Sequence, residues 1–251
     1  MHITTNSLYC DTISFFKKKW LIILIITFFS SSITSILDNI FALHLNILTI
    51  FYEFKTNHYH SLFDFIQTLT PDQQRQLLLF SIIKLCSSLI GNTFLISILT
   101  IFIQFTSLKK ENFFLELKRT NPYLFMSVFL LILINTIVIQ LGLVLLIVPG
   151  IIFFILLSLS PIILIINNTT ITKSIIDSIQ ITLNNFKVVS PAIIIWIFLK
   201  LIILMLLSDI NIISESISFF LLSIIINLIS SILIIYLFRF HMLSRSFRYF
   251  K

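Results

Sequence analysis

The feature that most constrains this chain is a series of long apolar runs that carry almost no charge. They cover residues 20–37, 85–108, 123–166, 191–208 and 216–238. Hydrophobic residues make up 58% of the chain and charged residues 11%, whereas a soluble domain carries about 25% charged residues. A soluble fold of this composition would lack a polar surface, so the sequence predicts an all-α, polytopic membrane protein.

The third run must be divided, because its 44 residues correspond to roughly 66 Å of helix at about 1.5 Å per residue. About 20 residues cross the hydrocarbon core once, so this run provides two crossings. Val148, Pro149 and Gly150 form the expected turn, since Pro breaks the helical hydrogen-bond ladder and Gly accepts a positive φ. The sequence thus predicts one membrane domain, residues 1–251, with six spans at about 20–37, 85–108, 123–147, 151–166, 191–208 and 216–238.

Basic residues mark one side of the membrane. They precede the first span and fill the second loop, the fourth loop and the C-terminal tail: Lys17, Lys18, Lys19, Lys109, Lys110, Lys118, Arg119, Lys173, Lys187, Arg239, Arg245, Arg248 and Lys251. The loops on the other side hold only Lys55 and Arg75. Because cytoplasmic loops carry the excess of Lys and Arg, both termini are expected in the cytoplasm. The net charge of +7 therefore reflects loop placement, and no nucleic-acid partner is expected.

The longest loop, residues 38–76, is expected to face outward. Near its end, Thr70 can cap a helix, Pro71 suits the first helical position and Gln73 can close a capping box. The second helix should therefore begin outside the membrane and run into it. Lys84 would extend its side chain back to the lipid headgroups.

The fourth loop contains a helical pattern at residues 170–187. Its polar residues recur at spacings of 4, 3, 4 and 3 and face away from its apolar ones: Lys173, Asp177, Gln180, Asn184 and Lys187, against Ile171, Ile175, Ile179, Leu183 and Phe186. This pattern predicts an amphipathic helix on the cytoplasmic membrane surface. It would sense lipid or dock a partner, or else serve only as a connector that its apolar face holds at the interface.

Lys200 is the candidate site residue, because it is the tenth of eighteen residues in the fifth span. A charge at the centre of a membrane helix costs about 2.5–3.5 kcal/mol on insertion scales and usually faces a bundle interior or a water-filled cavity. No Asp or Glu lies within the predicted spans to pair with it. One hypothesis is that Lys200 contacts an anion or the phosphate of a lipid. The other is that the helix is tilted or displaced, so that Lys200 reaches water, a headgroup or helix carbonyls.

Uncharged polar side chains within the spans are expected to join helices, since interhelical hydrogen bonds contribute about 0.6–2 kcal/mol in lipid. These residues are Asn92, Gln104, Asn135, Gln140 and Asn227. Two polar stripes predict packing seams between helices: Thr27, Ser31 and Thr34 in the first span, and Ser223, Asn227 and Ser231 in the last.

No catalytic, cofactor or metal site is predicted. The sequence contains no G-x-S-x-G, H-E-x-x-H, Walker or C-x-x-C motif, so no known catalytic signature supports an enzyme. His58, His60 and Asp64 form an H-x-H pattern with a carboxylate, which is a weak metal signal without a fourth ligand. Cys10 and Cys86 are expected on opposite faces of the membrane, where they cannot form a disulfide within one chain.

Short motifs spread in order along the chain resemble the YciC family, uncharacterised multi-pass proteins of the bacterial inner membrane. The matching segments are residues 7–9, 11–12, 15–16, 62–64, 70–74, 89–92, 148–152, 157–161 and 235–239. The chain departs from the family in using more Ile, Phe, Asn and Ser where relatives use Ala, Gly and Val. The resemblance implies a location in the bacterial cell inner membrane and supplies no catalytic residues.

The function that these observations favour is a non-enzymatic envelope component that binds lipid, such as anionic lipid, or another membrane protein. The alternative is a small transporter or channel that uses Lys200 and helices interrupted by proline near Pro161 and Pro191. The sequence names neither a ligand nor an oligomeric state.

Overall fold

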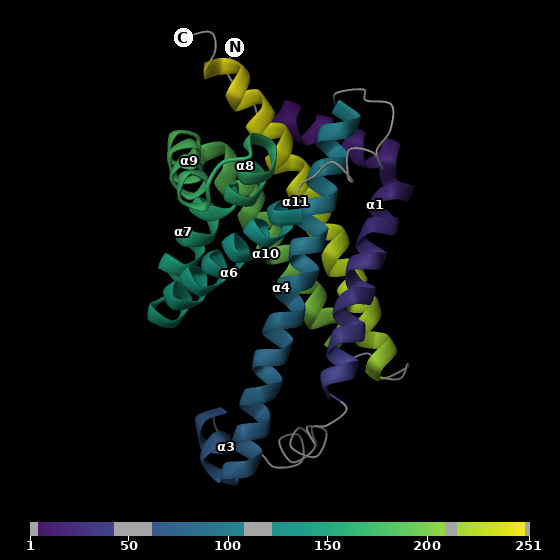
Figure 1. The fold of residues 1–251 in the computed structure, drawn as a ribbon, viewed down its shortest axis with the longest axis vertical. Coiled ribbons are helices and arrows are strands. Elements are labelled where there is room, and N and C mark those ends of the chain that lie inside the picture. Colours follow the sequence, from purple (N-terminus) through teal and green to yellow (C-terminus); the bar gives the residue numbers. More distant parts are fainter. Residues whose placement is uncertain (1–4, 43–61, 108–121, 209–214, 249–251) are drawn as a thin grey trace. The chain divides into compact units, whose positions relative to one another are not determined.

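The computed structural model describes residues 5–42, 62–107, 122–208 and 215–248, and these residues form helices and short connections without strands. The helices are α1 (Thr5–Ala42), α3 (Leu62–Thr68), α4 (Pro71–Ser107), α6 (Pro122–Leu145), α7 (Ile147–Leu157), α8 (Ser160–Asn167), α9 (Ile171–Asn184), α10 (Phe186–Ser208) and α11 (Glu215–Arg248) (Figure 1). Within these described residues, six helical stretches, in α1, α4, α6, α7 with α8, α10 and α11, are long and apolar enough to cross a membrane. The all-α prediction with six such helices is therefore confirmed.

The chain divides into two compact units, residues 1–31 with 92–251 and residues 32–91. Helices α1 and α4 each continue from one unit into the other. The first, larger unit holds α6 to α11, and the second holds α3 with the beginning of α4.

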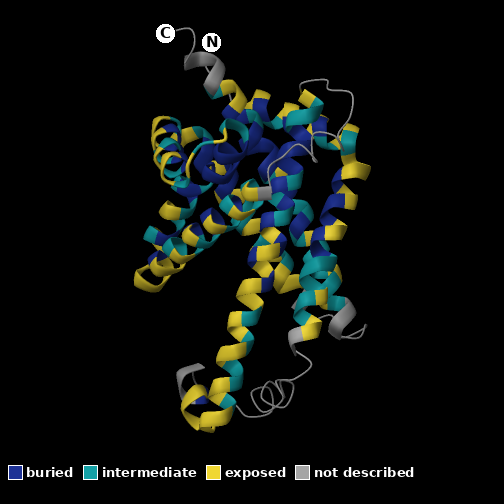
Figure 2. Ribbon diagram, in the orientation of Figure 1, coloured by how far each residue is buried: buried dark blue, intermediate teal, exposed yellow. Residues whose placement is uncertain are grey.

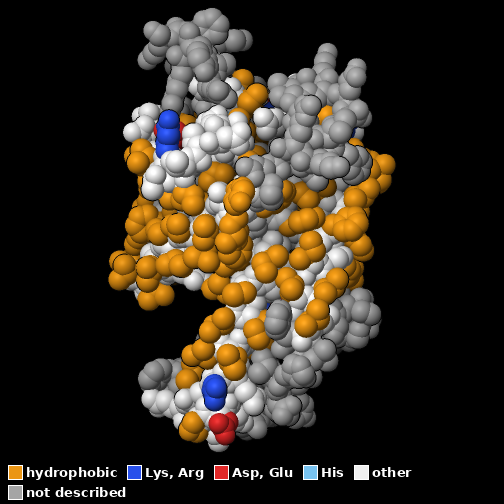
Figure 3. Space-filling model, in the orientation of Figure 1, with side chains coloured by type: hydrophobic (Ala, Val, Ile, Leu, Met, Phe, Trp, Pro, Cys, Tyr) orange, Lys and Arg blue, Asp and Glu red, His pale blue; other side chains and the backbone are white. Residues whose placement is uncertain are grey.

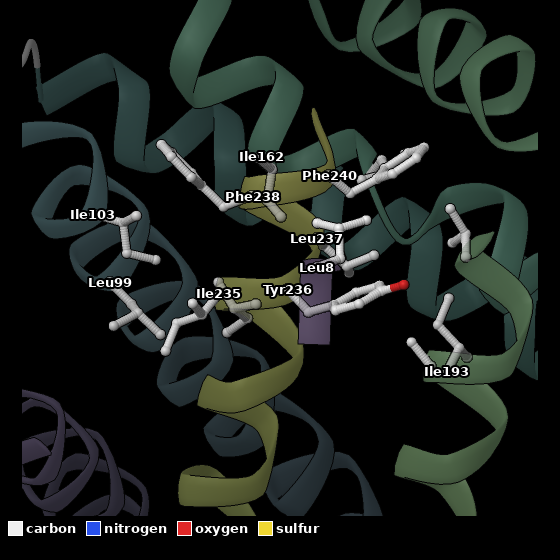
Figure 4. Close-up of a cluster of buried hydrophobic side chains, with 14 of the residues drawn as sticks. Leu8, Leu99, Ile103, Ile162, Ile193, Ile235, Tyr236, Leu237, Phe238 and Phe240 are labelled. Carbon is white, nitrogen blue, oxygen red and sulfur yellow. The ribbon is translucent and has the colours of Figure 1, made fainter. Parts of the chain in front are cut away.

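The core of the larger unit surrounds the C-terminal half of α11. Ile235, Tyr236, Leu237, Phe238 and Phe240 each expose 3% of their surface or less, and Figure 2 shows the buried residues concentrated around this part of α11 and α8. This segment is apolar on nearly every side, which is typical of a helix that is enclosed by others. Its neighbours include Leu8, Leu99, Ile103, Ile162 and Ile193, from α1, α4, α8 and α10 (Figure 4).

The N-terminal part of α1 is a helical segment that the sequence analysis missed. It begins at Thr5 and bends at Lys19, where φ is −123° and ψ is 20°. Leu8, Thr12 and Phe15 are buried, and their spacing of 4 and 3 places them on one face. Arg239 of α11 lies over the Phe15 ring at 5.0 Å and 3.7 Å from the Asp11 carboxylate. The segment therefore packs against the C-terminal end of α11.

A polar seam joins α1 to α11, as the two stripes predicted. Asn227 Nδ2 donates a hydrogen bond of 2.8 Å to Ser31 Oγ. Thr27 and Ser231 are fully buried beside them. Such bonds between helices stabilise packing where lipid offers no hydrogen-bond partner.

In the smaller unit, the predicted capping box is confirmed. Thr70 N donates to Gln73 Oε1 at 2.9 Å and Gln73 N donates to Thr70 Oγ1 at 3.4 Å, and α4 begins at Pro71. Gln74 Nε2 then donates to the Ile66 carbonyl of α3 at 2.9 Å. These contacts tie α3 to the first turn of α4.

Lys84 has a protein partner that the sequence analysis missed when it assigned this side chain to lipid headgroups. Its Nζ lies 2.6 Å from Asp38 Oδ2 of α1, and Ser87 Oγ donates to the other carboxylate oxygen. Asp38 directly follows the first predicted span and Lys84 directly precedes the second. The ion pair therefore joins α1 to α4 where the first apolar run ends and the second begins.

Candidate functional site

The α6–α7 hairpin turns earlier than the sequence predicted. Helix α6 ends at Leu145, Leu146 is extended with φ −161° and ψ 149°, and α7 starts at Ile147. Val148, Pro149 and Gly150 thus lie in the first turn of α7. The positive φ expected at Gly150 is wrong, because no described glycine has one.

Gly150 is needed for close packing instead. A Cβ atom at Gly150 would lie 2.5 Å from the Leu143 side chain, and one at Gly142 would lie 2.9 Å from the Gly150 Cα atom. Real Cβ contacts do not come this close, so the two glycines allow α6 and α7 to pack directly against each other.

The fourth apolar stretch is a broken helix. Pro161 lacks the N–H that would bond to the Leu157 carbonyl, and the chain leaves α7 at Ser158 and enters α8 at Ser160. Ser160 Oγ donates to the freed Leu157 carbonyl at 2.7 Å. Serine hydroxyls and neighbouring helices commonly satisfy such groups in membrane helices. The predicted interruption near Pro161 is therefore present, whereas α10 continues through Pro191.

Polar side chains from two neighbouring helices meet this break. Asn135 Nδ2 of α6 donates to Ser160 Oγ at 2.9 Å, which confirms that Asn135 joins helices. Ser178 Oγ of α9 donates to the Leu156 carbonyl at 2.6 Å. Asn135 exposes 7% of its surface, and its Oδ1 atom is buried without a hydrogen-bond partner. Asn135, Ser160 and Ser178 form a polar cluster, named here the break cluster, in apolar surroundings.

Helix α9 packs on the protein by a face that the sequence analysis did not single out. Its buried residues are Ser174, Ser178, Ile181 and Thr182, three of which are small and polar. Ile176 and Leu183 are 54% and 58% exposed, and Lys173, Gln180 and Asn184 are also exposed. A helix is present in the predicted segment, but it ends at Asn184, so Lys187 belongs to α10.

A cavity of about 200 Å³ that is open to the surface lies beside the break cluster, between α6, α7 and α9. It is lined by Ile134, Asn135, Val138, Phe153, Leu156, Leu157, Ile175 and Ile179. Asn135 thus belongs both to the break cluster and to the cavity wall. Leu156 and Leu157 of the wall supply the carbonyls that accept hydrogen bonds from Ser178 and Ser160. The sequence could not reveal this cavity, because its walls come from three separate helices.

Lys200 is partly buried on α10, and its ammonium group lies near an aromatic ring. Its Nζ lies 5.2 Å from the centre of the Trp196 ring, and that ring stacks on Phe154 of α7 at 5.3 Å with an interplanar angle of 7°. A cation over a desolvated indole gains about 2 kcal/mol. This contact offsets part of the cost of placing Lys200 within a span.

Among the residues that the structure describes, no group of three His, Cys, Asp or Glu side chains could hold a metal ion. His58 and His60 lie outside the described residues. Cys10 and Cys86 are free and exposed.

Comparison with known proteins places the chain among bacterial membrane proteins. A family model described as "Uncharacterised protein family (UPF0259)" matches residues 1–243. A UPF0259 membrane protein of Buchnera aphidicola subsp. Baizongia pistaciae is 48% identical over 248 residues, covering 98% of this chain and 99% of the relative. One from Pectobacterium carotovorum is 34% identical over 251 residues, covering 98% of this chain and all of the relative. No solved structure matches.

These matches agree with the expected kind of family, one of uncharacterised bacterial membrane proteins. The six apolar helices of the described residues fit that description. The chain belongs to the UPF0259 family of membrane proteins.

Proposed function

We propose that this protein is a non-enzymatic component of the bacterial inner membrane that binds anionic lipid on its cytoplasmic side through α9. The observation that carries the proposal is the division of α9 into three faces. Its small polar residues pack on the rest of the protein, which leaves an apolar strip, Ile176 with Leu183, and a polar face that includes Lys173 free of the core. Asp177 on the same face is only partly exposed, whereas Lys173 is exposed. Helices that present an apolar face and an exposed Lys or Arg bind at the interface of anionic membranes.

The charge distribution supports the cytoplasmic orientation. The loops that contain α9, the N-terminal lysines and the C-terminal arginines fall on one side when the six apolar helices are threaded through a bilayer in order. Cytoplasmic leaflets carry a negative surface potential that attracts such residues by about 1 kcal/mol each. An anionic headgroup would therefore be bound where the basic residues gather.

Native mass spectrometry of the purified protein tests this proposal. With phosphatidylglycerol and phosphatidylcholine offered in equal amounts, the parent should retain phosphatidylglycerol preferentially. Lys173→Gln should lower this preference about fivefold, since about 1 kcal/mol corresponds to that ratio. Arg75→Gln, which removes an exposed basic residue on the opposite predicted side, is the matched control and should leave the preference unchanged. Equal retention of the two lipids by the parent would contradict the proposal.

A second candidate function, a small transporter or channel, is favoured by the position of Lys200 in an apolar helix next to a broken helix. Lys200 would attract an anion within the membrane. Counterflow of chloride and phosphate into vesicles measures this activity. Lys200→Met should abolish the flux while the protein remains folded, because removal of a charge from a membrane helix favours insertion. Flux that is equal in the parent, the variant and empty vesicles would exclude this function for both anions.

A further inference from the structure

The cavity between α6, α7 and α9 is suited to an apolar occupant. Its volume of about 200 Å³ exceeds the roughly 150 Å³ of an engineered apolar cavity that excludes water and binds benzene. A buried water molecule needs two to four polar partners, and Asn135 supplies the only polar side chain of the cavity wall. Because the cavity is open to the surface, an apolar group that enters it gains dispersion contacts with its walls.

We propose that this cavity holds part of an acyl chain of a phospholipid whose phosphate lies on the Lys173 face of α9. The inference rests on the proposed function, because it places the chain of the lipid that α9 binds.

The surroundings of the cavity are apolar and accessible to a bilayer. Ile137 of α6 is 49% exposed, and Ile152 and Phe153 of α7 are 42% and 38% exposed. Figure 3 shows hydrophobic side chains over the α6–α7 hairpin and charged side chains over α9. Because α6 and α7 belong to the helices that are apolar enough to span a membrane, this surface would border lipid. The apolar groups next to the cavity would then be acyl chains.

The order of residues around α9 matches the two parts of a phospholipid. At 100° per residue, Ile175 and Ile179, which line the cavity, are followed by the exposed Ile176 and Leu183. Gln180 and Lys173 come next. A chain in the cavity can thus continue over the apolar strip to a phosphate at Lys173.

Asp177 does not lie in the path of this phosphate. On the same helical wheel it lies beyond Lys173, on the side away from the apolar strip. Around α9 from the apolar strip, a phosphate would therefore meet the Gln180 amide and the Lys173 ammonium group before the Asp177 carboxylate. This order fits one anionic headgroup with its chain, not a free apolar molecule.

The test uses phosphatidylglycerol with a diazirine in its acyl chain, incorporated with the full-length protein in nanodiscs. After photolysis, mapped adducts should occur on cavity residues of α7 and α9, such as Phe153, Ile175 and Ile179. Val138→Phe, which fills the cavity, should reduce these adducts at least fivefold. Ile137→Phe, its neighbour on the exposed face of α6, should leave them unchanged. Adducts on the exposed Phe198 and Leu201 of α10 report general lipid contact and should be equal in all three proteins.

Each outcome separates this inference from the proposed function. Cavity adducts that are absent from the parent, or that persist fully in Val138→Phe while the α10 adducts are normal, would overturn the acyl-chain site. If native mass spectrometry still showed a preference for phosphatidylglycerol, the proposed function would stand without it. Cavity adducts of equal yield with a diazirine phosphatidylcholine would support the chain site and overturn the part of the inference that assigns the phosphate to Lys173.

Discussion

Ser160 illustrates how one hydroxyl group can serve two helices in an apolar environment. It donates to the Leu157 carbonyl, which Pro161 leaves without an amide partner, and it accepts the Asn135 amide. A buried polar group that loses its partner costs about 1–3 kcal/mol. Because two groups depend on Ser160, its contribution should exceed that of a serine that bonds only within its own turn.

Ser160→Ala is therefore expected to destabilise the protein by about 2–4 kcal/mol, since both the carbonyl and the amide lose a partner. Thermal unfolding of the detergent-solubilised protein, followed by circular dichroism, measures the effect. Ser158→Ala is the matched control, because Ser158 Oγ bonds only to the Ile155 carbonyl of its own helix and should cost less than about 1 kcal/mol. Equal losses in the two variants would show that the bond between α6 and α8 contributes little.

At the scale of elements, the sequence predicted the helices that long uncharged runs define. It missed the features that depend on contacts between helices. The apolar runs identified the membrane helices, and the Thr70–Gln73 pattern identified the start of α4. The N-terminal part of α1 ends in three consecutive lysines, so it lies outside the uncharged runs, although the spacing of Leu8, Thr12 and Phe15 could have indicated a helix. The buried face of α9 could not be predicted, because Ser178 bonds to the Leu156 carbonyl of α7, a partner that only the tertiary structure brings near.

The α6–α7 hairpin depends on two glycines, Gly142 and Gly150, that allow the two helices to pack closely. Gly150→Ala should destabilise the protein by about 1–3 kcal/mol, the usual cost of overpacking, because the new methyl group would overlap Leu143. Val144→Ala, at a hairpin residue that is 84% exposed, is the control and should leave the unfolding temperature of the detergent-solubilised protein within 1–2 °C of the parent, as expected of an exposed site. An unchanged unfolding temperature in Gly150→Ala would mean that the two helices can separate at little cost.

At the scale of the whole molecule, topology decides which residues can meet lipid headgroups. Basic residues predict cytoplasmic termini, but they do not decide whether the α6–α7 hairpin crosses the membrane, since both of its ends lie on the same side in either case. Length argues for crossing: α6 has 24 residues, or about 36 Å, against a hydrocarbon core of about 30 Å. A crossing α6 is thus about 6 Å longer than the core, so the extended residue Leu146 at its end would reach the outer interface.

Cysteine labelling in intact cells tests this topology. In a Cys10→Ser, Cys86→Ser background, Leu146→Cys should react with a membrane-impermeant maleimide added outside, because a crossing hairpin brings the extended residue between α6 and α7 to the outer interface. Asp72→Cys, in the first turn of α4, should react similarly, whereas Ser14→Cys should react only after the cells are opened. Labelling of Asp72→Cys without labelling of Leu146→Cys, before or after opening, would show that the hairpin enters the bilayer and returns. The cavity beside the break cluster would then lie near one leaflet, and the lipid that fills it would have to come from the cytoplasmic side.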